Sequence, residues 1–376
     1  MDPLLKWRAE FPSLDRCVHL ISHSLGAMPK RAADRIAQYV REWDARSVRA
    51  WEEGWWDMPV TVGDLIGRII GAGEGEVCMH QNVSIAQSVV LSCFDWSGPR
   101  NKIVSDALNF PSNEYLHRAI RGAELIMVEA DEQAIVDAID DRTQLVSLSH
   151  VAFRTSALLD LKPIVEKAHR VGAMVAADLY QSAGCVTLDV RALGVDFAVG
   201  GSVKWLCGGP GNGYLYVRRD LWPRLSPAAT GWQAHARPFE FETGPIDYAN
   251  SIYKFLNGTP NVPAMYAGMS GYEIVGEIGA EAIREKSIRQ TQCLIELAEA
   301  AGFRNVGPRD PSKRGGTVVI DVPGGRDVVK ELARRDILCD YRPGAGVRLA
   351  PHFYTKDEEL ETAVAAITEV RESLAR

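Results

Sequence analysis

The sequence predicts an α/β protein built on a mostly parallel sheet. Between about Thr61 and Asp220, short apolar segments alternate with longer amphipathic ones. Apolar strands separated by helices are typical of βαβ units, in which helices cover both faces of a parallel sheet. The length of 376 residues fits about two to three folding units, or one large domain with a smaller one attached.

The apolar and amphipathic segments follow one another in a regular order. Seven segments are predicted strands: Glu76–Met79, Lys102–Ser105, Ala123–Val128, Leu145–Ser149, Met174–Ala177, Phe197–Gly200 and Gly213–Val217. Segments with helical periodicity lie between them: Asn82–Cys93, Ser112–Arg121, Gln133–Ala138 and Leu161–Val171. We therefore expect a large domain around one seven-stranded sheet.

After Trp222 the pattern changes. Residues 230–263 are rich in Gly, Pro and aromatic residues and have little periodicity, which is typical of a functional loop or a subunit contact. A long helical pattern then runs from about Val262 to Ala301, with a break near Gly276–Gly279. The remaining predicted elements are the strand Thr317–Val322, the helix Arg326–Arg335, the strands Ile337–Asp340 and Val347–Ala350, and the helix Lys356–Ala375. This order predicts a small α+β domain.

Three parts of the chain follow from these patterns. We expect residues 1–55 to form an N-terminal segment that packs on the small domain and the active site. Residues 56–260 would form the large domain, and residues 261–376 the linking helix and the small C-terminal domain.

Composition argues against several classes of protein. The chain has 42 Lys and Arg against 49 Asp and Glu, a net charge of −7, and no basic stripe that would bind nucleic acid or an anionic membrane. It has no apolar stretch of the roughly 18 residues that a membrane span needs, and its first residues lack the pattern of a signal peptide. The seven cysteines are scattered without a Cys-x-x-Cys motif. They predict reduced thiols in the cytoplasm and no metal site.

Two segments carry candidate chemistry. Asp178 directly follows the apolar residues 175–177, which places its carboxylate at the carboxyl end of a strand, where ligands bind in open α/β sheets. Lys204 follows the strand end at residues 200–202, has apolar neighbours, and precedes a glycine-rich turn at 208–213. Burial lowers the pKa of a lysine amine, and Schiff-base chemistry requires such an amine. Taken alone, Asp178 is more readily a helix cap and Lys204 a surface lysine at a strand end; together, in this order and before this glycine-rich turn, they favour a Schiff-base site. The glycine-rich turn precedes a strand and opens no helix, so it fails as a dinucleotide fingerprint.

The order Asp-x-x-Gln, strand, Ser-x-Lys and glycine-rich turn resembles the class V aminotransferase group of pyridoxal phosphate (PLP) enzymes, which have fold type I. Further segments between about residues 11 and 370 resemble kynureninases in particular: Ser24–Ala27, Asn109–Asn113, Arg154–Ser156, Gly231-Trp232, Pro238-Phe239, Gly258–Pro260, Tyr341–Pro343 and Arg348–Pro351. The resemblance implies a homodimer that binds pyridoxal 5'-phosphate and acts on a small amino acid substrate.

The resemblance also implies roles for residues at the cofactor ring. Lys204 would form the Schiff base with the cofactor and then move protons. Asp178 would pair with the pyridine nitrogen and keep it protonated. Phe110 would stack on the ring, Gln181 would bond its hydroxyl oxygen, and Asn113 and Ser156 would be further contacts.

Other residues would hold the phosphate and the substrate. Asn82, Val83 and Ser84 open a predicted helix whose N–H groups suit a phosphate, with Ser202 as a second candidate. Trp232 and Thr259 would come from the neighbouring subunit, so that the active sites are shared. Arg348 would bind the substrate carboxylate, with Arg342 as a rival, and His23 would cover the site. Ordinary structural roles stay open for these residues, such as an N-cap for Ser84.

Three positions depart from the kynureninase pattern. Gln181 stands where kynureninases have His, Val203 where they have Tyr, and Asn113 where they have Asp. Because a valine cannot supply a phenol, the reaction on kynurenine itself is left open. The predicted function is kynureninase-like C–C bond hydrolysis or lyase chemistry.

Transamination and a cysteine desulfurase or cysteine lyase reaction are the alternatives, as is a scaffold that has lost its chemistry. Desulfurases use a cysteine on a loop before the substrate arginine. Residues 340–347 contain none, and Cys339 falls on a predicted strand.

Overall fold

A seven-stranded sheet forms the centre of the large domain. The computed structural model describes residues 2–374. The strands are β2 (Val77–His80), β3 (Lys102–Asp106), β4 (Glu124–Val128), β5 (Thr143–Ser149), β6 (Met174–Asp178), β7 (Phe197–Gly201) and β8 (Gly213–Val217). Their order is β2-β8-β7-β6-β5-β3-β4, and β8 runs antiparallel to both of its neighbours while the other pairs are parallel. The predicted α/β class and mostly parallel sheet are confirmed.

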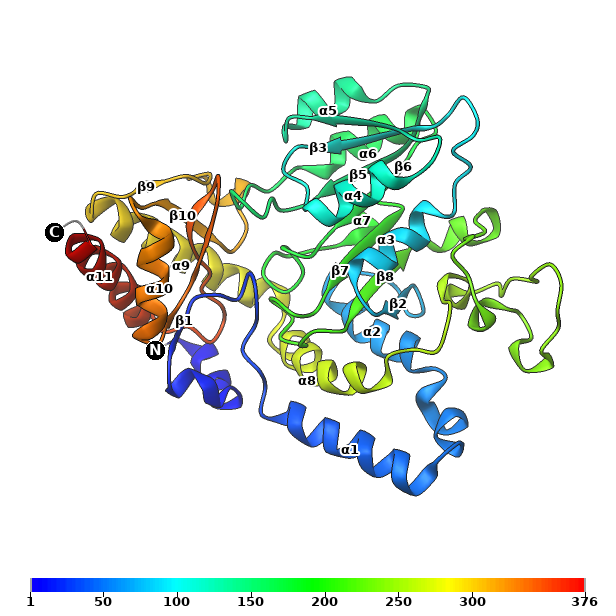
Figure 1. Cartoon of the computed structure of the whole chain (residues 1–376), viewed down its shortest axis with the longest axis horizontal. Helices are drawn as coiled ribbons and strands as arrows, with labels where there is room; N and C mark the ends of the chain where they lie inside the picture. The colour runs from blue at the N-terminus through cyan, green and yellow to red at the C-terminus, as the bar shows by residue number, and fades with distance from the viewer. Residues whose placement is uncertain (1, 375–376) are drawn as a thin grey trace.

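Helices flank this sheet, as the sequence pattern predicts (Figure 1). They are α2 (Met58–Ile70), α3 (Val83–Leu91), α4 (Pro111–Ala119), α5 (Glu132–Ala138), α6 (Leu161–Arg170) and α7 (Val190–Leu193). The helix α1 (Arg31–Arg46) lies away from the sheet and packs against α8 (Val262–Ile278) (Figure 1). Side-chain oxygens of Asn82, Asp131, Asp160 and Asp189 accept hydrogen bonds from free N–H groups at the starts of α3, α5, α6 and α7. The N-cap of α3 is therefore Asn82, and Ser84 lies inside the first turn.

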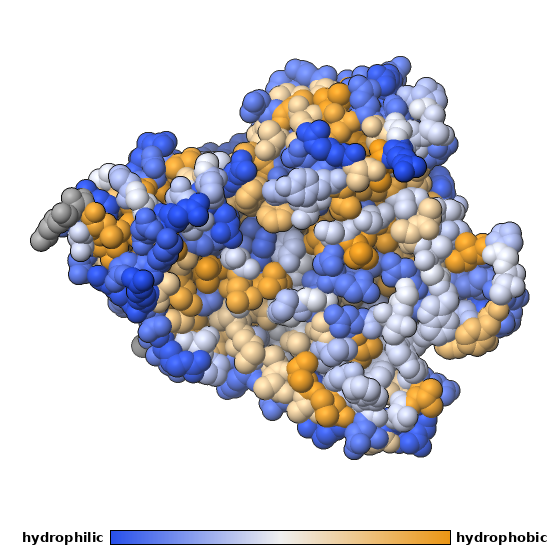
Figure 2. Space-filling model, viewed as in Figure 1, coloured by the Kyte–Doolittle hydropathy of each residue, from blue (hydrophilic) through white to orange (hydrophobic). Residues whose placement is uncertain are grey.

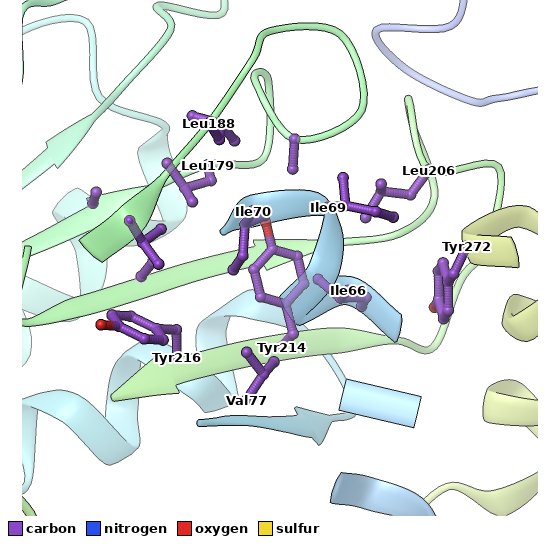
Figure 3. Packing of buried hydrophobic residues seen from close by; sticks show 14 of the residues in the cluster. Ile66, Ile69, Ile70, Val77, Leu179, Leu188, Leu206, Tyr214, Tyr216 and Tyr272 are labelled. Carbon is purple, nitrogen blue, oxygen red and sulfur yellow. The ribbon is translucent and has the colours of Figure 1, made fainter. Parts of the chain in front are cut away.

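The main core lies between the sheet and the helices that cover it. Ile66 and Ile70 of α2 lie beside Tyr214 of β8, Ile69 lies next to Leu206, and all of these residues are buried (Figure 3). Strands buried on both faces explain why the sequence shows continuous apolar runs there rather than alternation.

The C-terminal part contains a second sheet with the order β12-β13-β10-β9, in which all pairs are antiparallel. Its strands are β9 (Arg304–Asn305), β10 (Val318–Asp321), β12 (Asp340–Arg342) and β13 (Gly346–Leu349). The accompanying helices are α8 (Val262–Ile278), α9 (Ala280–Ala300), α10 (Gly325–Arg334) and α11 (Asp357–Leu374). The predicted helix break is confirmed, because Gly279 between α8 and α9 has a φ of 86°. The predicted end of the last helix, Ala375, lies outside the described residues.

The predicted strand Ile337–Asp340 is wrong in its extent, because two different partners divide it. Its first half, β11 (Ile337–Leu338), pairs in parallel with β1 (Val18–His19). Its last residue begins β12, which pairs with β13. Strand β1 and the bond from Ala350 N to Leu20 O, at 2.8 Å, join the N-terminal segment to the small domain.

Short 3-10 or π turns complete the chain: Pro3–Glu10, Pro12–Asp15, Trp51–Trp55, Arg219–Arg224, Trp232–Ala234, Pro238–Glu240, Ile252–Phe255 and Pro311–Lys313. Three of them lie in residues 230–261, the loop that extends from the body of the large domain at the right of Figure 1. The predicted irregularity of this stretch is confirmed.

Candidate active site

A cavity of about 210 Å³ lies at the carboxyl ends of β5 and β6. Eight of its lining residues are predicted site residues: Asn82, Val83, Ser84, Phe110, Asn113, Asp178, Gln181 and Lys204. The others are Ser112, Ser149, Val151, Phe153 and Tyr180. Residues from five separate stretches of the chain thus meet at one edge of the sheet, which is where open α/β sheets bind ligands.

Asp178 is the last residue of β6 and is buried. Its Oδ1 accepts a hydrogen bond from Tyr180 N at 2.8 Å, and its Oδ2 accepts one from Asn113 Nδ2 at 2.9 Å. Asn113 is itself held by Asn109 Oδ1, at 3.0 Å. Burial raises the pKa of Asp178, while these hydrogen bonds and the charge of Lys204 oppose the increase. Each carboxylate oxygen of Asp178 can still accept a further hydrogen bond from a group in the cavity.

Lys204 is half-buried in the turn after β7 and faces the same cavity. Burial lowers the pKa of its amine to about 8. The negative charge of Asp178 raises this pKa, and the positive charges of Arg348 and Arg342 lower it further. The structure thus agrees with the lowered lysine pKa expected from the apolar neighbours. The Nζ atom lies 5.7 Å from the ring centroid of Phe110, which is 44% exposed and forms one wall of the cavity.

The start of α3 forms another wall. Asn82 Oδ1 accepts a hydrogen bond from Ile85 N at 3.0 Å, so the N–H groups of Val83 and Ser84 are left for a ligand or water at this helix terminus. The backbone of Asn82 lies so close to β8 that a side chain at Gly213 would collide with its carbonyl carbon. The glycine at the start of β8 therefore sets the position of this turn.

Gln181 lines the cavity with its side-chain amide already engaged. Its Nε2 donates to His23 O at 3.0 Å, and its Oε1 accepts from Trp205 Nε1 at 3.1 Å. One N–H of the amide remains for a ligand.

Four predicted cofactor contacts do not line the cavity. The Oγ of Ser156 accepts a hydrogen bond from Thr317 N at 3.2 Å, and the Oγ of Ser202 donates to Gly209 O at 3.2 Å. Trp232, which is 41% exposed, and the exposed Thr259 lie on the loop of residues 230–261. Their roles stay predictions.

The predicted substrate residues form a cluster beside the cavity. The buried Arg348 donates from Nε and Nη2 to Asp340 Oδ1 and Oδ2, at 2.7 and 2.6 Å, and from Nη1 to Phe153 O at 2.6 Å. His23 Nε2 lies 3.0 Å from Asp340 Oδ1, and the half-exposed Arg342 lies 3.1 Å from Oδ2. Burial alone would raise the pKa of Asp340, but His23 and Arg348 hold it well below its usual range. Burial lowers the pKa of His23 to about 4, so His23 is neutral near pH 7.

Several cavity residues escaped the sequence reasoning. Tyr180, Ser149 and Phe153 carry no motif, and each is an ordinary residue type for the end of a strand or a loop. The only sequence feature that could have pointed to Tyr180 is its position two residues after Asp178.

Residues 2–374 contain neither a cluster of metal ligands nor a membrane-spanning helix. No group of three or more His, Cys, Asp or Glu residues in this range is arranged to hold a metal ion. None of the described helices is long and apolar enough to cross a membrane.

Comparison with known proteins places this chain in a family. The family described as aminotransferase class-V matches residues 20–352. The chain belongs to this family. Among similar proteins, the kynureninase of Pseudomonas fluorescens is 31% identical over 98% of this chain and 92% of its own length. A kynureninase of Burkholderia pseudomallei (strain 1106a) is 30% identical over 98% of this chain and 92% of its own length.

Solved structures share the fold at lower identity. A cysteine desulfurase from Thermococcus onnurineus NA1 matches with a TM-score of 0.84 and 20% identity, over 98% of both chains. The cystine C–S lyase C-DES, in complex with cysteine persulfide, matches with a TM-score of 0.85 and 21% identity, over 96% of this chain and 99% of the other.

Class V membership confirms the predicted PLP-dependent enzyme that acts on an amino acid. The chemistry of the cavity fits this cofactor. A buried carboxylate, an amine whose pKa is about 8, an aromatic wall and a helix N-terminus line the same space. These groups match the basic nitrogen, the aldehyde, the ring face and the phosphate of PLP, respectively.

Proposed function

We propose that this class V enzyme is a kynureninase-like hydrolase of the cytoplasm, active as a homodimer, that cleaves a C–C bond in the side chain of an amino acid. The observation that carries the proposal is the meeting of Asp178 and Lys204 in one cavity. The similarity to two kynureninases over nearly the whole chain supports this reaction over others. In the reaction one water is consumed: the Cβ–Cγ bond breaks, the acyl carbon gains hydroxyl, and Cβ gains a proton to give alanine.

Residues of the cavity would divide the work. Bound PLP supplies a ring that withdraws electrons from the substrate. Asp178 would hold a negative charge at the ring nitrogen, and Asn113 and the Tyr180 N–H keep that carboxylate in place. The Lys204 amine has a pKa of about 8, close to the pH at which it would accept and return a proton at the substrate. The N–H groups of Val83 and Ser84 would hold the phosphate.

On the substrate side, we assign the carboxylate to Arg348, with His23 beside it. A guanidinium has five N–H donors, and three of those of Arg348 are bonded within the protein. The two that remain suit one carboxylate. A lysine at this position would keep the charge and lose the planar geometry. Arg348→Lys should therefore raise KM at least tenfold with a smaller change in kcat, whereas an Arg342→Lys control should leave KM within about twofold. An unchanged KM in Arg348→Lys would remove the assignment.

Shared active sites would explain the place of Trp232 and Thr259. Both lie outside the cavity of their own chain, on a loop that extends from the domain (Figure 1). Exposed apolar side chains also follow one face of α1, at Ile36, Val40 and Trp43, spaced four and three residues apart. Hydrophobic and hydrophilic surface alternate along the lower edge of the molecule, where α1 runs (Figure 1, Figure 2). An apolar helix face of this kind is what a second subunit would cover.

Subunit mixing tests this sharing. Lys204→Ala and Trp232→Ala homodimers should each be inactive or weak, and unfolding and refolding them together should restore activity through hybrids with one intact site. No gain over the separate variants, or a monomer in sedimentation, would contradict shared sites.

A reduced compartment is supported by the cysteines, since all seven are free thiols. The thiol of Cys339 does not fit the persulfide route of a desulfurase. Cys339 is buried, and burial raises its pKa to about 12, so it is protonated near pH 7 and is a poor nucleophile.

A panel of amino acids, offered to the PLP-loaded enzyme and followed by mass spectrometry, tests the reaction. Kynurenine-type substrates should give alanine and a carboxylic acid that carries one oxygen from labelled water. A keto acid with the amino form of the cofactor would instead show transamination, and sulfide from cysteine would show a cysteine lyase. Either result without alanine formation would contradict the proposed hydrolase.

A further inference from the structure

Tyr180 contributes an aromatic side chain to the cavity in addition to its main-chain N–H. It lies two residues after Asp178, and its N–H donates to Asp178 Oδ1 at 2.8 Å. Its ring faces the Lys204 amine, with the Nζ atom 4.0 Å from the ring centroid. The same Nζ lies 5.7 Å from the centroid of Phe110. Two aromatic faces are thus directed at one amine, and both rings line the cavity.

Gly201, the last residue of β7, makes the position of this ring possible. A Cβ at Gly201 would lie 2.5, 2.6 and 2.7 Å from Cζ, Oη and Cε2 of Tyr180. These distances are shorter than side chains tolerate, so the phenol ring occupies the space that a side chain at this position would fill. Gly201 does not have a positive φ. The position therefore needs a glycine for space, and its backbone conformation is open to other residues.

The phenol of Tyr180 is better suited to forming a wall of the cavity than to transferring a proton. Burial and the nearby charge of Asp178 raise the pKa of Tyr180 to about 12. The side chain is therefore a neutral aromatic ring near pH 7. The main-chain bond to Asp178 holds the backbone of Tyr180 beside the carboxylate that would meet the cofactor nitrogen, and the close approach of Gly201 leaves the ring its place.

We propose that Tyr180 is the second wall of the cofactor slot, so that the PLP ring stacks between Phe110 and Tyr180, and that Gly201 is small to let Tyr180 lie flat against β7. The inference rests on the proposed cofactor site and adds a positioning residue to it. Offset stacking of one aromatic pair changes a binding constant by about 2- to 12-fold. We expect Tyr180 to contribute a factor of this size to PLP affinity.

The test measures PLP binding to cofactor-free protein by equilibrium dialysis, without any substrate. Tyr180→Phe keeps the ring and should bind PLP within about twofold of the unchanged protein, whereas Tyr180→Leu keeps apolar bulk without the ring and should bind about 2- to 12-fold more weakly. Equal affinity in Tyr180→Leu and the unchanged protein would overturn the inference. So would a loss in Tyr180→Phe as large as in Tyr180→Leu, because it would show that the hydroxyl acts and the ring does not.

Gly201 allows a second, independent measurement. Gly201→Ala should push the Tyr180 ring into the slot and weaken PLP binding. In a Tyr180→Ala background the new Cβ meets free space, so the same substitution should have little further effect. Additive losses would contradict the contact on which the inference rests. Failure of the unchanged protein to bind PLP would instead refute the proposed cofactor site, so the two failures are distinct.

Discussion

Replacing Asn113 with aspartate is expected to make the stability of the cofactor-free protein fall steeply with rising pH. Asn113 Nδ2 donates to Asp178 Oδ2 at 2.9 Å, and both residues are buried. Asn113→Asp replaces this donor with an oxygen that is also negatively charged when ionised. Two like charges at 2.9 Å repel by about 6 kcal/mol at an effective dielectric constant of about 20. One carboxyl of the pair will therefore stay protonated in the folded protein to a pH well above its unfolded pKa.

The sign of the pH effect follows from proton linkage. A carboxyl whose folded pKa lies above its unfolded value stabilises the fold below the unfolded pKa, and that contribution disappears as pH rises toward the folded pKa. Each unit of this increase in pKa costs about 1.4 kcal/mol. We expect Asn113→Asp to lose about 1 kcal/mol at about pH 5 and about 3–5 kcal/mol at about pH 8, relative to the unchanged protein.

Urea unfolding at these two pH values measures the difference. Asn113→Ala is the matched control, because it removes the same donor without adding a charge. Its expected loss is about 1.5–3 kcal/mol with a weaker pH dependence. An equal loss for Asn113→Asp at both pH values would refute the reasoning, since it would mean that the two carboxyls do not share one buried space.

Three further predictions follow from the same geometry. Because the neutral amine is the nucleophile and the pKa of Lys204 is about 8, stopped-flow absorbance should show PLP attachment speeding up with pH and levelling off above about 8; a flat profile would contradict this. Arg348→Ala should lower the free energy of unfolding by about 3–5 kcal/mol because it removes the buried, two-bond partner of the Asp340 carboxylate and leaves only half-exposed Arg342 and neutral His23 beside it. Because Arg342 is half-exposed, Arg342→Ala should lower the free energy of unfolding by less than about 1 kcal/mol. Equal losses in the two variants would contradict the buried pair of Arg348 and Asp340. Gly213→Ala should destabilise the fold by about 1–3 kcal/mol and weaken PLP binding, because the new side chain would displace the turn before α3. Gly276 lies on the open surface of a helix, so Gly276→Ala should stabilise the fold by up to about 1 kcal/mol. Thermal denaturation that ranks the two variants in the opposite order would contradict the packing at Gly213.

Much of the fold could be predicted from the sequence because most of the central strands are buried on both faces, while the edge strand β4 is half-buried. Five of the seven central strands contain three or more consecutive apolar residues, and the bounds of all seven were predicted within two residues. The antiparallel direction of β8 left no such signal, because strand direction depends on the connection and the partners. Strands β1 and β9 have two residues each, too few to show any periodicity.

The site could be predicted in part, for a similar reason. Asp178 and Lys204 stand at strand ends, where spacing alone places them at the ligand-binding edge. The partnership of Asp340 and Arg348 depends on the register of β12 and β13, which sets the two residues directly opposite each other. The fit of Tyr180 against Gly201 depends on packing between neighbouring strands. Neither relation is visible in a linear pattern.

Reductive trapping of the cofactor tests the central claim most directly. The PLP-loaded protein is treated with borohydride, digested, and mapped by mass spectrometry for the pyridoxyl phosphate adduct. The account predicts one adduct, on the peptide that contains Lys204, and none on that peptide in Lys204→Arg. An adduct on another buried lysine, such as Lys254 or Lys286, with Lys204 unmodified, would contradict it.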